Sequence, residues 1–157
     1  MSLHVVLYEP EIPANTGNIA RTCLATNTTL HLIHPLGFST DNKMLKRAGL
    51  DYWKHVKVKE YHSIEQLYDQ YPAGSFYYVE NYGKTYYTDP DFSNREDELF
   101  FIFGKETKGL PKQWLVENPS QCIRIHMKDQ VRSLNLSNAA AIIIYEALRQ
   151  QGFPNMS

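Results

Sequence analysis

The run Leu99–Phe103, with the sequence LFFIF, limits the choice of fold more than any other segment of this chain. It is apolar at every position, so a strand formed here must be covered on both faces, as strands of a parallel sheet are. Five other runs have the length and composition of strands. They are the apolar runs Leu3–Tyr8, Leu30–Ile33, Phe76–Val79 and Cys122–His126, and the alternating run His55–Lys59.

Helical patterns lie between these runs. The predicted helices are Asn15–Asn27, Thr40–Ala48, Ser63–Gln70 and Ser137–Gln151. Asn15 and Ser137 are the predicted caps of the first and last helix. The polar and acidic stretch Tyr82–Glu98 indicates a surface excursion. Alternating strands and helices predict an α/β fold, with a mainly parallel sheet and helices on both faces.

Length and composition narrow the class of protein. A chain of 157 residues, 43% hydrophobic and 21% charged, is typical of one globular domain spanning residues 1–157. Cys23 and Cys122 form neither a CxxC pair nor a cluster with histidines, which disfavours a disulfide scaffold and a metal site. The N-terminus does not resemble a signal peptide, and the apolar run Ala139–Tyr145 is too short to span a bilayer. We therefore expect a cytoplasmic protein with no membrane partner.

Parallel sheets bind ligands beyond the carboxyl ends of their strands, which directs attention to the loops that follow the predicted strands. The first such loop leads into the motif Pro13–Arg21, PANTGNIAR. A glycine and two asparagines at a helix start expose backbone N–H groups, an arrangement that suits an anion. A helix capped by Asn15 with a solvated Arg21 explains the same residues without a ligand.

The second motif, Gly104–Pro111 (GKETKGLP), directly follows the LFFIF strand. Its GxxxxG spacing resembles a phosphate-binding loop, but that loop requires Lys and then Ser or Thr after the second glycine. Leu110 and Pro111 occupy those positions, which disfavours a nucleotide hydrolase with a phosphate-binding loop. The glycines indicate either a close approach of the backbone or a plain loop that bends at each glycine.

The third motif, Val131–Ala141 (VRSLNLSNAAA), runs from a polar loop into a helix with small side chains. Ile142, Ile143 and Ile144 then make this helix apolar nearly all round, and such helices are buried. Either it is the central core helix of the domain, or one side of it packs against a partner subunit.

Together, the three motifs resemble the SPOUT superfamily of RNA methyltransferases. LYEPEIPANTGNIAR and MLKRAGLDYW resemble more narrowly its TrmL (YibK-like) group of tRNA 2′-O-methyltransferases. The resemblance extends from about Val5 to Gly152. It implies a deep trefoil knot in the C-terminal part, a homodimer, and a single domain without a separate RNA-binding domain. It also implies the cofactor S-adenosylmethionine, converted to S-adenosylhomocysteine, with no metal.

The resemblance assigns roles to individual residues. Arg21 matches the catalytic arginine, and Tyr145 matches a tyrosine near the dimer interface. The cofactor-binding positions are Val79, Gly104, Ile125, Ser133 and Leu134. The implied substrate is the ribose 2′-OH of the wobble nucleotide, cytidine 34 or 5-carboxymethylaminomethyluridine 34, in the anticodon stem-loop of certain tRNAs, notably leucine isoacceptors. DNA is not an expected partner.

The chemistry restricts what Arg21 can do. A guanidinium stays protonated in proteins, so Arg21 is better suited to holding a phosphate and stabilising developing negative charge than to acting as a base. Glu106 and His34 are the other proton acceptors to consider. Two rival functions remain: a SPOUT enzyme for another tRNA position or for ribosomal RNA, and a non-catalytic module that binds cofactor or RNA.

The net charge of −1 hides an uneven distribution along the chain. Residues 41–61 and residues 104–132 each carry six basic and three acidic groups, whereas residues 62–103 carry two and eight. A nearly neutral chain can therefore present a basic face to RNA. The candidate RNA contacts are Asn15, Lys46, Arg47 and Arg132.

Overall fold

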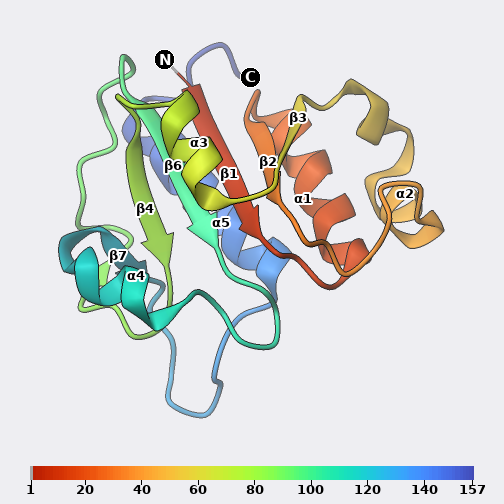
Figure 1. Cartoon of the computed structure of the whole chain (residues 1–157). Helices are drawn as coiled ribbons and strands as arrows, with labels where there is room; N and C mark the ends of the chain where they lie inside the picture. The colour runs from red at the N-terminus through yellow and green to blue at the C-terminus, as the bar shows by residue number, and fades with distance from the viewer. Residues whose placement is uncertain (1) are drawn as a thin grey trace.

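The computed structural model describes residues 2–157 and contains one seven-stranded sheet with helices on both faces (Figure 1). The strands are β1 Ser2–Tyr8, β2 Thr29–Ile33, β3 Val58–Tyr61, β4 Ser75–Val79, β5 Thr85–Tyr86, β6 Glu98–Phe103 and β7 Cys122–Arg124. The helices are α1 Pro13–Ala25, α2 Lys43–Gly49, α3 Ile64–Gln70, α4 Lys112–Glu117 and α5 Leu136–Gln150, with 3-10 turns at Leu50–His55 and Pro119–Gln121.

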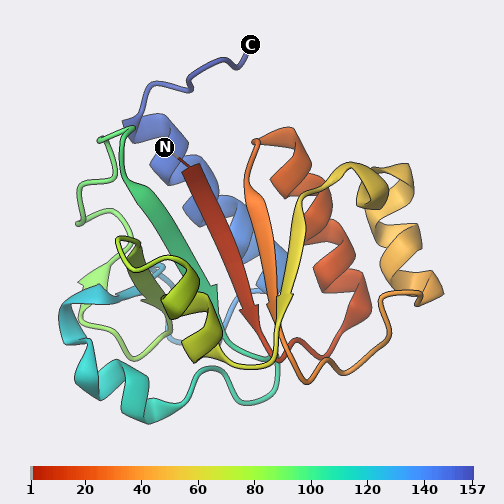
Figure 2. The ribbon, with the colours of Figure 1, turned by 45° about the horizontal axis from the view of Figure 1, so that its top comes forward.

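The strands follow the order β3-β2-β1-β6-β4-β7-β5, and each neighbouring pair is parallel. The α/β fold with a parallel sheet is therefore confirmed. The LFFIF segment forms most of β6, which lies between β1 and β4 near the middle of the sheet. Because each pair is parallel, the carboxyl ends of all these strands lie at the same edge of the sheet. The arrowheads of the long central strands show this in Figure 2.

Alternate residues of the central strands explain why LFFIF is apolar throughout. Leu99, Phe101 and Phe103 pack with residues of α1 and α5 on one face of the sheet. Phe100 and Ile102 pack with residues of α3 on the other face. Figures 1 and 2 show α3 in front of the sheet and α5 behind it. A strand covered on both faces has no position that favours a polar side chain.

Several predicted boundaries and caps were wrong. The second helix is Lys43–Gly49 and not Thr40–Ala48, and the sixth predicted strand ends at Arg124 and not at His126. The third strand is Val58–Tyr61 and not His55–Lys59. It lies at the edge of the sheet, where hydrogen bonding to β2 sets its position, and its own residues show little alternation of buried and exposed side chains. Helix α1 starts at Pro13, a favoured first residue, and its side chains provide no cap. Helix α5 is capped by Asn135, whose Oδ1 accepts hydrogen bonds from the N–H groups of Ser137 and Asn138.

The excursion Tyr82–Glu98 is not wholly on the surface. It contains β5, which pairs with β7 and extends the sheet. It also contains Phe92, a fully buried side chain whose ring lies 5.2 Å from that of Phe101. Helix α4 is a further element that the sequence pattern did not predict.

Helix α5 is buried on one side only. Ile143, Ile144 and Ala147 are buried against the sheet and α1, whereas Ile142 and Tyr145 are 36% and 42% exposed. Of the two alternatives for this helix, the structure does not support a core helix buried on all sides, because one apolar strip faces outward. The trefoil knot stays a prediction. None of the helices within residues 2–157 is long and apolar enough to cross a membrane.

Candidate functional site

A cavity of about 720 Å³ lies beyond the carboxyl ends of β4, β6 and β7. This is the edge at which parallel sheets bind ligands. The loops that follow β6 and β7 meet here, below the strand ends in Figure 1. The cavity is lined by Ile12, Asn15, residues 79–82, residues 103–109, Ile125, Met127, residues 132–136 and Ala139.

Two glycines shape the loop between β6 and α4, which forms one wall of the cavity. A Cβ on Gly104 would lie 2.1 Å from the carbonyl carbon of Gly109, so only glycine lets the loop double back here. Gly109 has a φ of +69°, and its N–H donates to the carbonyl of Lys105 at 2.8 Å. Of the two interpretations of this motif, close backbone packing is therefore the one that the structure supports.

Carboxylates fasten this loop to the start of α1. The side chain of Glu106 accepts hydrogen bonds from the N–H groups of Glu11 and Ile12, both at 2.9 Å. A negative charge at this end of α1 also interacts favourably with the helix dipole. In return, Glu11 accepts from the N–H and hydroxyl of Thr107, which lowers the pKa of the Glu11 carboxyl. Lys105 and Glu9 form an ion pair at 2.7 Å.

Asn15 connects all three sequence motifs. Its Nδ2 donates to Glu106 of the second motif at 3.2 Å, and its Oδ1 accepts from Asn135 of the third motif at 3.0 Å. Asn15 is only 7% exposed. The pattern typical of a helix cap thus marks a residue that holds together segments far apart in the sequence.

The five residues predicted for cofactor binding surround this one cavity. Val79 and Ile125 lie at or just after the ends of β4 and β7, and Gly104 directly follows β6. Ser133 and Leu134 come from the loop before α5. The predicted RNA contact Arg132 also lines the cavity, and its carbonyl accepts a hydrogen bond from the side chain of Asn81.

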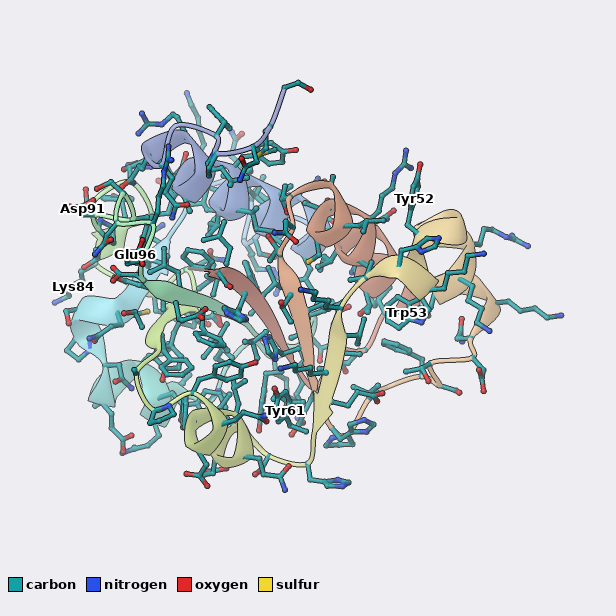
Figure 3. The ribbon with its side chains drawn as sticks, turned by 90° about the horizontal axis from the view of Figure 1, so that it is seen from above. Tyr52, Trp53, Tyr61, Lys84, Asp91 and Glu96 are labelled. Atoms are coloured by element: carbon teal, nitrogen blue, oxygen red, sulfur yellow. The ribbon has the colours of Figure 1, made fainter. Side chains whose placement is uncertain are left out.

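Arg21 does not line this cavity. It is exposed on α1, with its guanidinium carbon 5.5 Å from the ring centroid of Tyr52. Figure 3 shows Tyr52 and Trp53 at the end of the molecule opposite to Lys84, Asp91 and Glu96. Lys46 and Arg47 are exposed on α2, which packs against α1. Tyr145 is also outside the cavity lining.

The two alternative proton acceptors have other partners. Glu106 accepts the three hydrogen bonds described above and so has a structural function. His34 follows β2, pairs with Glu60 at 2.7 Å and is not among the cavity residues. Within residues 2–157 there is no group of three or more His, Cys, Asp or Glu side chains that could hold a metal ion.

Sequence reasoning missed Glu80, a carboxylate on the cavity wall directly after β4. Burial raises the pKa of the Glu80 carboxyl. Its only local signal is an acidic residue immediately after an apolar strand, at the edge where ligands bind.

A parallel α/β sheet with a cavity beyond the carboxyl ends of its strands is the arrangement in which such proteins bind ligands. Within this class of α/β proteins, a model of the SpoU rRNA Methylase family matches residues 2–145, nearly the whole chain. The chain belongs to this family of methyltransferases, and the resemblance found from its three motifs is confirmed.

Two relatives and two solved structures define the relationship further. A protein of Geobacillus stearothermophilus, provisionally named tRNA (cytidine(34)-2′-O)-methyltransferase, is 63% identical over all of both chains. The tRNA (cytidine(34)-2′-O)-methyltransferase of Escherichia coli K12 is 42% identical over 97% of this chain and 96% of its own.

A solved structure concerned with 2-OH methylation of C/U34 on tRNA is 41% identical, with a TM-score of 0.88 over 96% of this chain and 97% of that one. The methyltransferase AviRb of Streptomyces viridochromogenes, solved with the cofactor AdoMet, is 26% identical. Its TM-score is 0.81 over 96% of this chain and 58% of that one.

Proposed function

We propose that this chain uses S-adenosylmethionine to methylate the ribose 2′-OH of the wobble nucleotide, position 34, of tRNA. The observation that carries the proposal is that five predicted cofactor residues, from three separate loops, surround one cavity. The names of relatives that are 42% and 63% identical over nearly full length support the same reaction.

The cavity fits the cofactor in size and chemistry. Ligand cavities typically measure about 300–1,000 Å³, and this one falls in that range. Val79, Ile125 and Leu134 supply apolar walls for an adenine ring, and the loop 104–109 supplies backbone groups. When bound, the cofactor would supply an electrophilic methyl group: the 2′ oxygen would bond to this carbon as the methyl–sulfur bond breaks, the hydroxyl proton would pass to solvent, and S-adenosylhomocysteine would remain.

Arg21 is proposed to hold an RNA phosphate and to stabilise negative charge as it forms on the 2′ oxygen. A guanidinium is always charged and has five donors, which suits both tasks. The ring of Tyr52 supports it from one side. Both ends of the Asn15 amide are engaged within the protein, so the RNA contact is proposed for Lys46, Arg47 and Arg132.

A homodimer is part of the proposal. Ile142 and Tyr145 expose an apolar strip on α5, which a second copy would cover. Arg21 lies outside the cavity of its own chain, so a dimer that brings Arg21 of one subunit to the cavity of the other would complete each site.

The central experiment is transfer of a labelled methyl group to bulk tRNA and to ribosomal RNA, followed by mapping of the modified nucleotide. We expect label at ribose 34 of a subset of tRNAs. Label in ribosomal RNA or at another tRNA position would favour the rival enzyme functions. Cofactor or RNA binding without any transfer would favour a non-catalytic module.

The shared site has its own test. Subunits carrying Arg21→Ala and subunits carrying Gly104→Val are each expected to be inactive. After unfolding and refolding together, mixed dimers would pair an intact cavity with an intact Arg21 from the other subunit, and activity should return. If Arg21 serves its own cavity, the mixture stays inactive.

A further inference from the structure

Glu80 is an ionisable group on the cavity wall that neither the fold nor the proposed reaction explains. It follows Val79, one of the apolar walls, and faces the glycine loop. A Cβ on Gly109 would lie 2.0 Å from Oε1 of Glu80, so glycine at 109 leaves room for this carboxylate. The backbone thus accommodates Glu80 in a defined place on the cavity wall.

The carboxylate of Glu80 has acceptor capacity that the protein does not use. Its one hydrogen bond to another segment is a long one, at 3.4 Å from the N–H of Leu110. Good N–H···O bonds measure about 2.7–3.2 Å, and an ionised carboxylate offers about four acceptor positions. Within the described chain, Glu80 is in no ion pair, in contrast to Glu9, which pairs with Lys105.

Burial disfavours the charged form of Glu80 and raises the pKa of its carboxyl. Such a group is stabilised when a ligand brings hydrogen-bond donors to it. Val79 and Glu80 line the same cavity, so an adenosyl ligand with its base against Val79 has its ribose within the region that Glu80 can reach. A ribose presents two neighbouring hydroxyls, which match the two oxygens of a carboxylate.

We propose that Glu80 accepts hydrogen bonds from the two ribose hydroxyls of the cofactor and thereby selects a ribonucleoside ligand. This inference rests on the proposed function, since it requires an adenosyl cofactor in the cavity. It gives Glu80 a function in binding, separate from that of Arg21 in transfer.

The test is a thermodynamic cycle in which Glu80 and the ribose hydroxyls are changed separately and together. Calorimetry measures the binding affinity for each combination, and no methyl transfer is needed. The probes are S-adenosylhomocysteine and its 2′-deoxy and 3′-deoxy forms, each titrated into the wild-type protein and into Glu80→Gln. In the wild type, we expect removal of a hydroxyl to weaken binding about tenfold or more, as expected for a lost charge-assisted hydrogen bond. In Glu80→Gln the same removal should weaken binding less than about threefold.

The control is Glu65→Gln, which neutralises an exposed carboxylate on α3 outside the cavity lining. It should behave as the wild type with all three ligands. Equal weakening of all three ligands by Glu80→Gln would mean that Glu80 only supports the loop, and the inference would be wrong.

A fourth ligand, the analogue that lacks the 6-amino group of the base, checks the point of contact. Suppose that Glu80→Gln abolishes the difference in affinity between ligands with and without the 6-amino group, but not the difference caused by removing a hydroxyl. Glu80 then contacts the base, and the ribose assignment fails. If the wild type binds none of the adenosyl ligands, the proposed function itself fails. This outcome differs from one in which the ligands bind but Glu80→Gln does not change the effect of removing a hydroxyl.

Discussion

Two groups of ionisable residues differ in their surroundings: one lines the cavity at the strand ends, and the other is packed between the sheet and α3. The first group, Glu80, Glu106 and Lys105, lines the cavity at the strand ends. The second, here called the histidine cluster, consists of His4, His31, Tyr61 and Glu98 on the side of the sheet that α3 covers.

The histidine cluster satisfies its own hydrogen bonds. His4 and His31 share a hydrogen bond of 2.8 Å, and each has a second partner, Glu98 at 2.7 Å and Tyr61 at 2.9 Å. His4 also stacks on Phe100 at 4.0 Å. Burial lowers the pKa of His31 to about 3, yet His31 is not among the residues that line the cavity.

The difference shows that a shifted pKa does not by itself identify a functional site. Both Glu80 and His31 are shifted by burial. Only Glu80 lies on a cavity and retains unused acceptors. Changes at the cavity should therefore alter binding and transfer, whereas changes in the histidine cluster should alter stability alone.

The largest effect is expected from Gly104→Val. A Cβ at this position would collide with the backbone of Gly109, so the loop wall must move and cofactor binding should be lost. Calorimetry with S-adenosylmethionine measures the loss, and circular dichroism checks that the fold persists. Lys112→Ala, on an exposed position of α4, is the matched control and should bind normally. Normal affinity of Gly104→Val would place the cofactor elsewhere.

The next effect is expected from Arg21→Ala. Removing one group that stabilises charge in a transition state typically lowers the rate about 10²- to 10³-fold. Because Arg21 is proposed to act on the RNA and on the reacting oxygen and is not among the proposed cofactor contacts, the affinity for cofactor should not change. Single-turnover methyl transfer at saturating cofactor gives the rate. Turnover close to that of the wild type would remove both functions proposed for Arg21.

The sequence predicted most of the sheet because apolar runs show burial directly. Leu99–Phe103 and Leu3–Tyr8 lie within one residue of β6 and β1. Strand β5 and helix α4 escaped prediction, because two and six residues are too few to show a period. The edge strand β3 was misplaced, since its position depends on pairing with β2.

The candidate site was predictable as a set of loops, but its internal contacts were not. Asn15 and Glu106 are 91 residues apart, and Asn15 and Asn135 are 120 apart. Neither contact leaves a local pattern, so Asn15 was interpreted as a helix cap. Glu80 is a single acidic residue without a motif, and only the closed loop around Gly109 reveals its setting.

The histidine cluster predicts acid sensitivity of the fold. His31 has a folded pKa of about 3 and an ordinary value of 6.5, so between these values the unfolded chain binds the extra proton. The free energy of unfolding should therefore decrease as the pH falls below about 6.5. The His31 contribution is about 2 kcal/mol between pH 7.5 and 5. Burial also lowers the pKa of His4, which acts in the same direction.

Urea unfolding at several pH values measures this slope. His31→Gln should flatten it, and the exposed His55→Gln is the control that should not. The affinity for cofactor, measured over the same pH range, should be equal in His31→Gln and the wild type. A change in affinity would show that the histidine cluster and the cavity are coupled, contrary to the distinction drawn above.

The smallest effect is expected at the basic surface of α2. Lys46→Ala and Arg47→Ala remove exposed charges that are outside both the cavity and the histidine cluster. Lys46 already has a weak partner in Asp41, 3.7 Å away, so Arg47 should contribute more. Each lost phosphate contact should reduce the slope of log affinity against log salt by about 0.7 for a single-stranded anticodon loop.

Filter binding of tRNA at several salt concentrations measures that slope, and the transfer rate at saturating tRNA should stay unchanged. Lys84→Ala is a suitable control, since Figure 3 places Lys84 at the far end of the molecule. If Lys84→Ala changes the slope and Arg47→Ala does not, the RNA lies along β5. In that case the basic stretch of residues 41–61 is only a solvated surface. Of the regions compared here, the cavity alone would then contribute to function.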